Sequence, residues 1–123
     1  MSKSILIVDD SESIRELVGS TLEEAGYTVT RGVNGKDGLE CLQQMDENVK
    51  LIITDLNMPV MDGIELVKEV RKHKNFKYLP ILILTTETQV TKKREAKAEG
   101  ATGWIVKPFE KERLLSVVKK VIR

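Results

Sequence analysis

Residues 5–10 read Ile-Leu-Ile-Val-Asp-Asp, a short apolar run that ends in two carboxylates. Two similar runs, rich in β-branched residues, occupy residues 49–53 and 81–84, with little of the polar alternation of a strand that has one wet face. Runs of this kind are typical of parallel strands covered on both faces. Residues 27–30 do alternate and predict a half-exposed edge strand, and residues 104–106 predict a fifth, short strand.

Segments with the helical spacing of apolar residues separate these strands. Ser11 and Ser13 are competing N-caps of the first helix, and Asn34 can cap the second. Strands that alternate with helices predict a doubly wound α/β sandwich of five units with right-handed crossovers. The apolar positions of four helices run from Ile14 to Ala25, from Leu39 to Met45, from Ile64 to Val70 and from Leu114 to Ile122.

The segment from about Val90 to Glu99 predicts a helix of a different kind. Val90, Ala96 and Ala98 are nearly all of its apolar content. A helix that buries so little is loosely held, as expected of an element that moves or meets a partner.

Size and composition narrow the class of protein. The chain has 123 residues, a formal net charge of +1, one cysteine and one histidine. These values exclude an internal disulfide and argue against a zinc site or a general attraction to nucleic acid. No apolar run approaches the roughly 20 residues that span a bilayer. We therefore expect one soluble, cytoplasmic domain over residues 1–123, without an output domain.

The charge is unevenly distributed along the chain. Residues 87–123 hold 10 of the 20 cationic residues and 5 of the 19 acidic ones, a net charge of +5, and the remainder carries −4. Either these cations cover a solvated helix surface, or they form a docking face for an acidic partner.

Ionisable or hydroxyl side chains stand where four of the five predicted strands end. These are Asp9 with Asp10, Asp55 after Thr54, Thr85, and Lys107. Taken singly, an aspartate or threonine there could cap the next helix, and the lysine could be solvated. In an open parallel sheet, however, the carboxyl ends of the strands line the functional crevice. The four together predict a site.

The chemistry of such a site follows from its charges. Three crowded carboxylates repel one another, and Mg²⁺ is the natural counter-ion for oxygen ligands without nearby His or Cys. A carboxylate beside Mg²⁺ and an ammonium group is a plausible nucleophile toward a phosphoryl group. Asp55 is the best candidate because it begins an exposed loop, with Thr85 and Lys107 available to the phosphoryl oxygens. Pro108 either redirects the chain so that Lys107 turns over the strand ends, or simply starts a helix.

Five stretches together resemble the receiver domain of two-component response regulators. They are Ile-Leu-Ile-Val-Asp-Asp, the loop Thr-Asp-Leu-Asn-Met-Pro-Val-Met-Asp-Gly, the strand ending in Thr85, Gly-Ala-Thr-Gly-Trp and Val-Lys-Pro-Phe. The similarity covers the whole chain in the family's order and is closest to stand-alone chemotaxis receivers of the CheY-like type. It implies a flavodoxin-like strand order, 2-1-3-4-5.

The resemblance also implies roles for individual residues. Asp55 would accept a phosphoryl group from a histidine kinase, and Lys107 would pair with it. Thr85 and Trp104 would be the switch pair, although the family more often has Tyr or Phe at the second position. Asn57 and Glu87 would flank the hydrolytic water and make the acyl phosphate short-lived. The Mg²⁺ ligands would be Asp9, Asp10, Asp55 and the backbone carbonyl of Asn57.

By the same resemblance, phosphorylation would change the face formed by helix 90–99, strand 104–106 and the last helix. A downstream protein, for example a flagellar motor switch, would bind that face. The receiver itself would act as a monomer and would bind neither nucleic acid nor a membrane. It would not be an enzyme beyond its own phosphorylation and dephosphorylation. Alternatives are a phosphate sink for another regulator and a phosphorylation-independent adaptor.

Two functions from other classes fit the residues less well. An aspartyl phosphatase has a second acid two residues after its nucleophile, where this chain has Asn57. A flavin carrier binds phosphate after its first strand, where Asp9 and Asp10 would repel it. Of the remaining single residues, Cys41 is expected to be a half-buried filler, and His73 is expected to be solvated.

Overall fold

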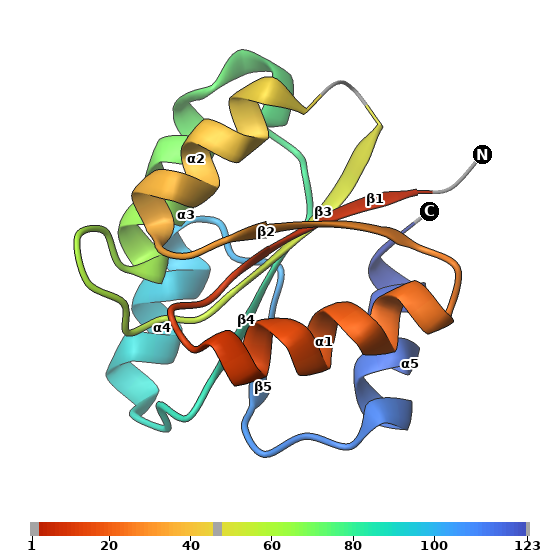
Figure 1. Ribbon diagram of the computed structural model, residues 1–123. Helices are drawn as coiled ribbons and strands as arrows, with labels where there is room; N and C mark the ends of the chain where they lie inside the picture. The colour runs from red at the N-terminus through yellow and green to blue at the C-terminus, as the bar shows by residue number, and fades with distance from the viewer. Residues whose placement is uncertain (1–2, 46–47, 123) are drawn as a thin grey trace.

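Five parallel strands form one sheet in the order β2-β1-β3-β4-β5, as expected. The computed structural model describes residues 3–45 and 48–122. Helices α1 and α5 cover one face of the sheet, and α2, α3 and α4 cover the other (Figure 1). The strands are β1 (Ser4–Val8), β2 (Thr28–Gly32), β3 (Val49–Thr54), β4 (Ile81–Thr85) and β5 (Gly103–Val106). The helices are α1 (Glu12–Glu24), α2 (Gly35–Gln44), α3 (Gly63–Lys72), α4 (Val90–Glu99) and α5 (Lys111–Val121), with a 3-10 turn at Lys74–Phe76.

The two faces of β1 explain why its sequence lacks polar alternation. Ile5 and Ile7 pack into the apolar cluster shared with α1 and α5, and Leu6 and Val8 pack into the cluster on the other face. The edge strand β2 is mostly half-buried, which agrees with its alternating sequence. The predicted α/β sandwich is therefore confirmed.

Short polar side chains determine where three helices begin. Ser11 caps α1, Asn34 caps α2 and Asp62 caps α3, each accepting a hydrogen bond from a backbone N–H of the first turn. Ser13, the competing candidate, lies inside α1. The loop after β1 therefore ends at Ser11, and the loop after β3 ends at Asp62.

Helix α4 is held by few apolar contacts. Ala96 is its one buried residue, and its N-cap, Gln89, makes no side-chain capping bond. At the other end, the side chain of Arg71 donates to the carbonyl of Gly100 at 2.7 Å. The prediction of a thinly buried fourth helix is confirmed.

Candidate functional site: an acidic cluster bridged by a lysine

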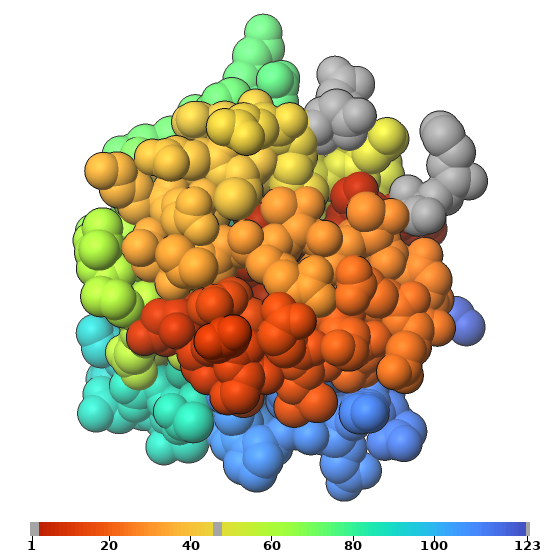
Figure 2. Space-filling model, viewed as in Figure 1, coloured from red at the N-terminus to blue at the C-terminus, as the bar shows by residue number. Residues whose placement is uncertain are grey.

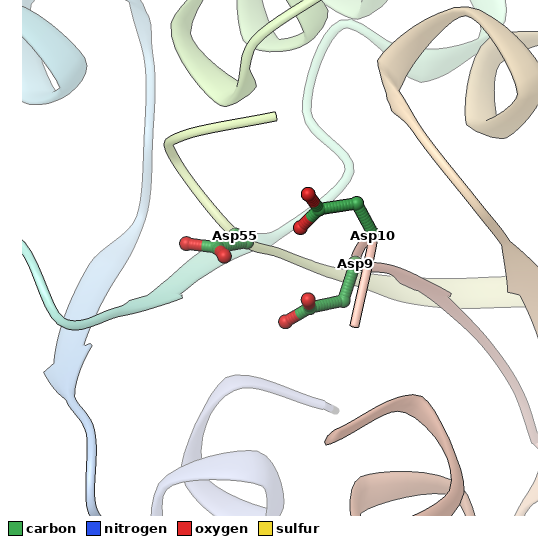
Figure 3. Close-up of side chains that lie close together, drawn as sticks. All are labelled: Asp9, Asp10 and Asp55. Carbon is green, nitrogen blue, oxygen red and sulfur yellow. The ribbon is translucent and has the colours of Figure 1, made fainter. Parts of the chain in front are cut away.

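Three carboxylates meet at the carboxyl ends of two neighbouring strands. Asp9 and Asp10 follow β1, and Asp55 follows β3, which pairs with β1. One oxygen of each side chain lies within 4.8 Å of the others, and the three side chains extend in the same direction (Figure 3). Asp9 is buried, the side chain of Asp55 is 12% exposed and Asp10 is exposed. The cluster can therefore be approached from solvent on the side of Asp10.

An ammonium group completes the cluster from a distant strand. Lys107, which follows β5, places its Nζ 2.8 Å from Oδ2 of Asp9 and 3.3 Å from Oδ2 of Asp55. Its side chain is only 10% exposed, so it is not a solvated lysine. The Lys107–Pro108 peptide bond is cis. Helix α5 begins at Lys111, so Pro108 is not its first residue.

The electrostatic environment favours a further cation. Burial raises the pKa of Asp9, although hydrogen bonds from Lys107 and from the backbone N–H of Ser11 act in the opposite direction. Three carboxylates face a single ammonium group, which leaves an excess of negative charge. Among the described residues, the side chains that could ligate a metal here are all carboxylates, a set suited to a hard divalent ion such as Mg²⁺.

The backbone around Asp55 fixes the direction of its side chain. The N–H of Leu56 donates to Oδ1 of Asp55 at 2.6 Å, while Oδ2 is the atom nearest Lys107. The Thr54 hydroxyl donates to the Asp55 carbonyl at 2.8 Å. A Cβ on Gly63 would overlap with that same carbonyl oxygen. The two oxygens of Asp55 thus have different partners.

Arg15 supports the site, and the sequence analysis missed it. Its Nη1 donates to the carbonyl oxygen of Asp9 at 2.7 Å, from the first turns of α1. A signal was available, because Arg15 follows the N-cap Ser11 by four positions, about one helical turn.

Thr85 and Glu87 lie in the turn that leads into α4. The buried hydroxyl of Thr85 accepts from the backbone N–H of Glu87 at 3.2 Å. The Glu87 carboxylate accepts from the N–H groups of Thr88 and Gln89, both at 3.2 Å. Thr85 therefore does not cap α4, which starts at Val90, and Glu87 turns toward the start of that helix.

Trp104 and Asn57 are less tightly tied to the cluster. Trp104, in β5, is half-buried and packs against the apolar residues on the α2–α4 side of the sheet. With Lys93 and Lys97 of α4 it lines a hollow of about 180 Å³. Asn57 is exposed in the loop after Asp55. Their roles in switching and hydrolysis stay predictions.

Comparison with known families decides the classification. Residues 5–119 match the response regulator receiver domain. The chain belongs to this family. Within it, the chain is similar over nearly its whole length to CheY-type receivers of two-component chemotaxis signalling.

Two relatives and one solved structure illustrate the similarity. The receiver is 37% identical over 120 residues to chemotaxis protein CheY1 of Helicobacter pylori, covering 96% of this chain and 95% of that protein. It is 36% identical to the sensor histidine kinase CheAY of the same species, covering 97% of this chain but only 15% of the kinase's length. The structure of Vibrio cholerae CheY4 superposes with a TM-score of 0.94 at 48% identity, covering 99% of this chain and 100% of that one.

Proposed function

We propose that this receiver accepts a phosphoryl group on Asp55 and uses it to control a partner protein. The observation that carries the proposal is the position of Lys107, whose ammonium group bridges Asp9 and Asp55. One oxygen of Asp55 would attack the phosphorus while the bond from phosphorus to the donor breaks, leaving an acyl phosphate. Lys107 would then pair with the added phosphoryl oxygens.

Mg²⁺ is the cofactor that the cluster would hold. Asp9, Asp10 and Asp55 would supply carboxylate oxygens, and Asn57 its backbone carbonyl. When bound, the ion supplies positive charge for the phosphoryl oxygens. The excess of carboxylates over ammonium groups supports this assignment.

Thr85 and Trp104 would transmit the change to α4. In the structure, the Thr85 hydroxyl accepts a hydrogen bond from the N–H of Glu87. A phosphoryl group above β3 to β5 would draw the hydroxyl away from this partner. The space that Thr85 vacates would admit Trp104, and α4, with one buried residue, would shift at little cost. The face of α4, β5 and α5 would then present a different basic surface to the partner.

Asn57 and Glu87 would set the lifetime of the acyl phosphate. Glu87 would have to release the N–H groups of Thr88 and Gln89 before it could face a hydrolytic water. Both residues are polar, so we propose a short lifetime, which Asn57→Leu and Glu87→Leu would lengthen.

The similarity to chemotaxis proteins supports a proposal for the partners. We propose a histidine kinase as phosphodonor, which the similarity to part of the CheAY kinase supports. The phosphorylated receiver would bind a downstream protein such as a flagellar motor switch. Alternatively, it would act as a phosphate sink that removes phosphoryl groups from another regulator by way of their shared kinase. We further propose that the receiver acts in the cytoplasm as a monomer. None of the helices in residues 3–45 and 48–122 is long and apolar enough to cross a membrane.

Acid-quenched intact mass spectrometry tests the proposal. Wild type, incubated with Mg²⁺ and acetyl phosphate, should gain one phosphoryl group, and Asp55→Asn should gain none. Asp62→Asn is the matched control, because it changes an aspartate of the same loop while Asn keeps the ability to cap α3. A phosphoryl increment that survives in Asp55→Asn would overturn the assignment. No increment in wild type, even at the shortest times, would favour the adaptor.

A further inference from the structure

A second cavity lies near the amino end of β3, whereas Asp55 follows the carboxyl end of the same strand. It has a volume of about 580 Å³ and is lined by the end of α2, the start of β3 and the segment that links α3 to β4. Val49 is the first residue of β3, whereas Asp55 follows the last one. Figure 2 shows this linking segment, in green at the top, projecting beyond the end of α2. The volume falls within the range of roughly 300–1,000 Å³ that is usual for small-molecule sites.

Internal hydrogen bonds hold the wall of this cavity in place. Arg71 donates to the carbonyl of Phe76 at 2.9 Å and also to Gly100 at the end of α4. The N–H of Leu79 donates to the same Phe76 carbonyl at 3.3 Å. Phe76 is itself buried in the core and forms part of the cavity lining. A site preformed in this way loses less entropy on binding.

The described residues at the rim of the cavity include two lysines. Lys74 and Lys77 are exposed lining residues, and neither forms an ion pair with any residue in the described part of the chain. None of the described lining residues is acidic. Asp46 and Glu47 stand in the sequence between the lining residues Met45 and Val49 but lie outside the described residues, so the experiment below includes them.

Aromatic rings and one buried nitrogen accompany the lysines. Tyr78 is 87% exposed, an unusual position for a large aromatic side chain. The His73 ring lies 5.1 Å from that of Phe76. The expectation that His73 is solvated is wrong, because it is half-buried and its Nδ1 has no hydrogen-bond partner among the residues that the structure describes. The ring lies against Phe76 and its Nδ1 is buried, while the residue as a whole stays half-buried.

We propose that this cavity binds a small aromatic anion of the size and chemistry of a nucleoside monophosphate. Lys74 and Lys77 meet the phosphate, and the exposed ring of Tyr78 stacks on the base. The apolar floor of Val49 and Phe76 contacts the body of the ligand. This site goes beyond the proposed function, because it uses none of the residues around Asp55.

Titration with AMP, followed by the backbone amide signals in NMR, tests the site. Mg²⁺ is omitted, and Asp55→Asn is titrated beside wild type, so the outcome does not depend on phosphorylation. Both proteins should show the same saturable shifts, concentrated in residues 73–79 and near Val49. Adenosine, which lacks the phosphate, should bind at least roughly fivefold more weakly. Shifts centred elsewhere, no saturable shifts, or equal affinity for adenosine would overturn the proposal.

Four variants separate charge from stacking. Lys74→Gln with Lys77→Gln should weaken AMP at least roughly fivefold and leave adenosine unchanged. Tyr78→Ala, at an exposed position that leaves the fold intact, should weaken both. Lys92→Gln with Lys93→Gln, an equal charge change on α4, should change neither. Asp46→Asn with Glu47→Gln should keep or tighten AMP binding, and weaker binding would contradict the role given to charge.

Discussion

The ammonium group of Lys107 lies 2.8 Å from an oxygen of Asp9, a residue 98 positions away in the chain. The same group lies 3.3 Å from Asp55, so one cation serves the ends of β1 and β3 together. Because these atoms lie close together, we expect Lys107 to compete with a bound metal ion for the same oxygens. The contact therefore links the stability of the fold to the chemistry of the site.

Replacing Lys107 with Gln should destabilise the metal-free protein and strengthen its binding of Mg²⁺. The free energy of unfolding should fall by about 2 kcal/mol, since hydrogen bonds to buried charged groups are lost. Mg²⁺ should bind several-fold more tightly, because its competitor is gone. Urea unfolding and calorimetric titration measure the two effects, with the exposed Lys111→Gln as control. Weaker Mg²⁺ binding by the variant would show that Lys107 does not compete for these oxygens.

Asp9→Asn should stabilise the metal-free protein at pH 7 and weaken its binding of Mg²⁺. Burial raises the pKa of Asp9 above its value in the unfolded chain, so the folded state disfavours the ionised form. Stability from this group is present below the unfolded pKa and is lost as the pH rises through the folded pKa. The advantage of the variant should therefore shrink in acid. Urea unfolding at pH 7 and at an acidic pH checks this, with the exposed Asp10→Asn as control. A stability advantage of Asp9→Asn that grows in acid would contradict burial as the cause.

Gly63→Ala should lower stability and disturb phosphorylation. A Cβ at this position overlaps with the backbone carbonyl of Asp55, which cannot move without shifting the Asp55 side chain, the proposed phosphoacceptor. We expect a loss of about 2 kcal/mol, as for other overpacked sites, and a slower gain of the phosphoryl mass.

Gly19→Ala is the matched control for that change. The atoms nearest to its Cβ would belong to the guanidinium group of Arg31, the far end of a long side chain that ion-pairs with Glu16 and Glu23 and is partly exposed. The gain in helix propensity, about 1 kcal/mol, should offset the displaced ion pairs. If both variants lost the same stability, the Asp55 carbonyl would not be the cause.

Val60→Asn should stabilise the loop after Asp55. Val60 has a φ of 71°, a left-handed conformation that a β-branched residue adopts only under strain, and its side chain is 73% exposed. Asn tolerates this region better, so the free energy of unfolding should rise by about 1 kcal/mol. The same substitution at exposed Val33, which does not have a positive φ, should bring no gain. Equal effects at the two positions would argue against strain at Val60.

Glu87→Ala should loosen the start of α4. The Glu87 carboxylate accepts from two N–H groups ahead of a helix that lacks its own side-chain cap. Its loss should cost about 1 kcal/mol locally and speed amide hydrogen exchange in residues 88–93. Amides of α3, which keeps its own capping box at Asp62, provide the internal reference. Unchanged exchange at the start of α4 would show that Glu87 does not hold it.

Much of the fold could be read directly from local pattern. The apolar run before Asp9 predicts a strand covered on both faces, and the sparse apolar content after Val90 predicts a weakly held helix. The N-cap of α1 could not be predicted uniquely, because Ser11 and Ser13 have the same side chain and only the backbone conformation distinguishes them. His73 was misjudged, since its burial depends on the ring of Phe76 rather than on its charged neighbours.

The periods of the strands and helices, and the reactive side chains at the strand ends, can be read from neighbouring residues alone. Three contacts, in contrast, are visible only in the folded chain: Oδ2 of Asp55 faces Lys107, Arg15 supports the backbone of Asp9, and Glu87 turns toward α4. These contacts depend on distances of a few ångströms between separate loops. Packing of the whole sheet sets such distances, and no local pattern encodes them.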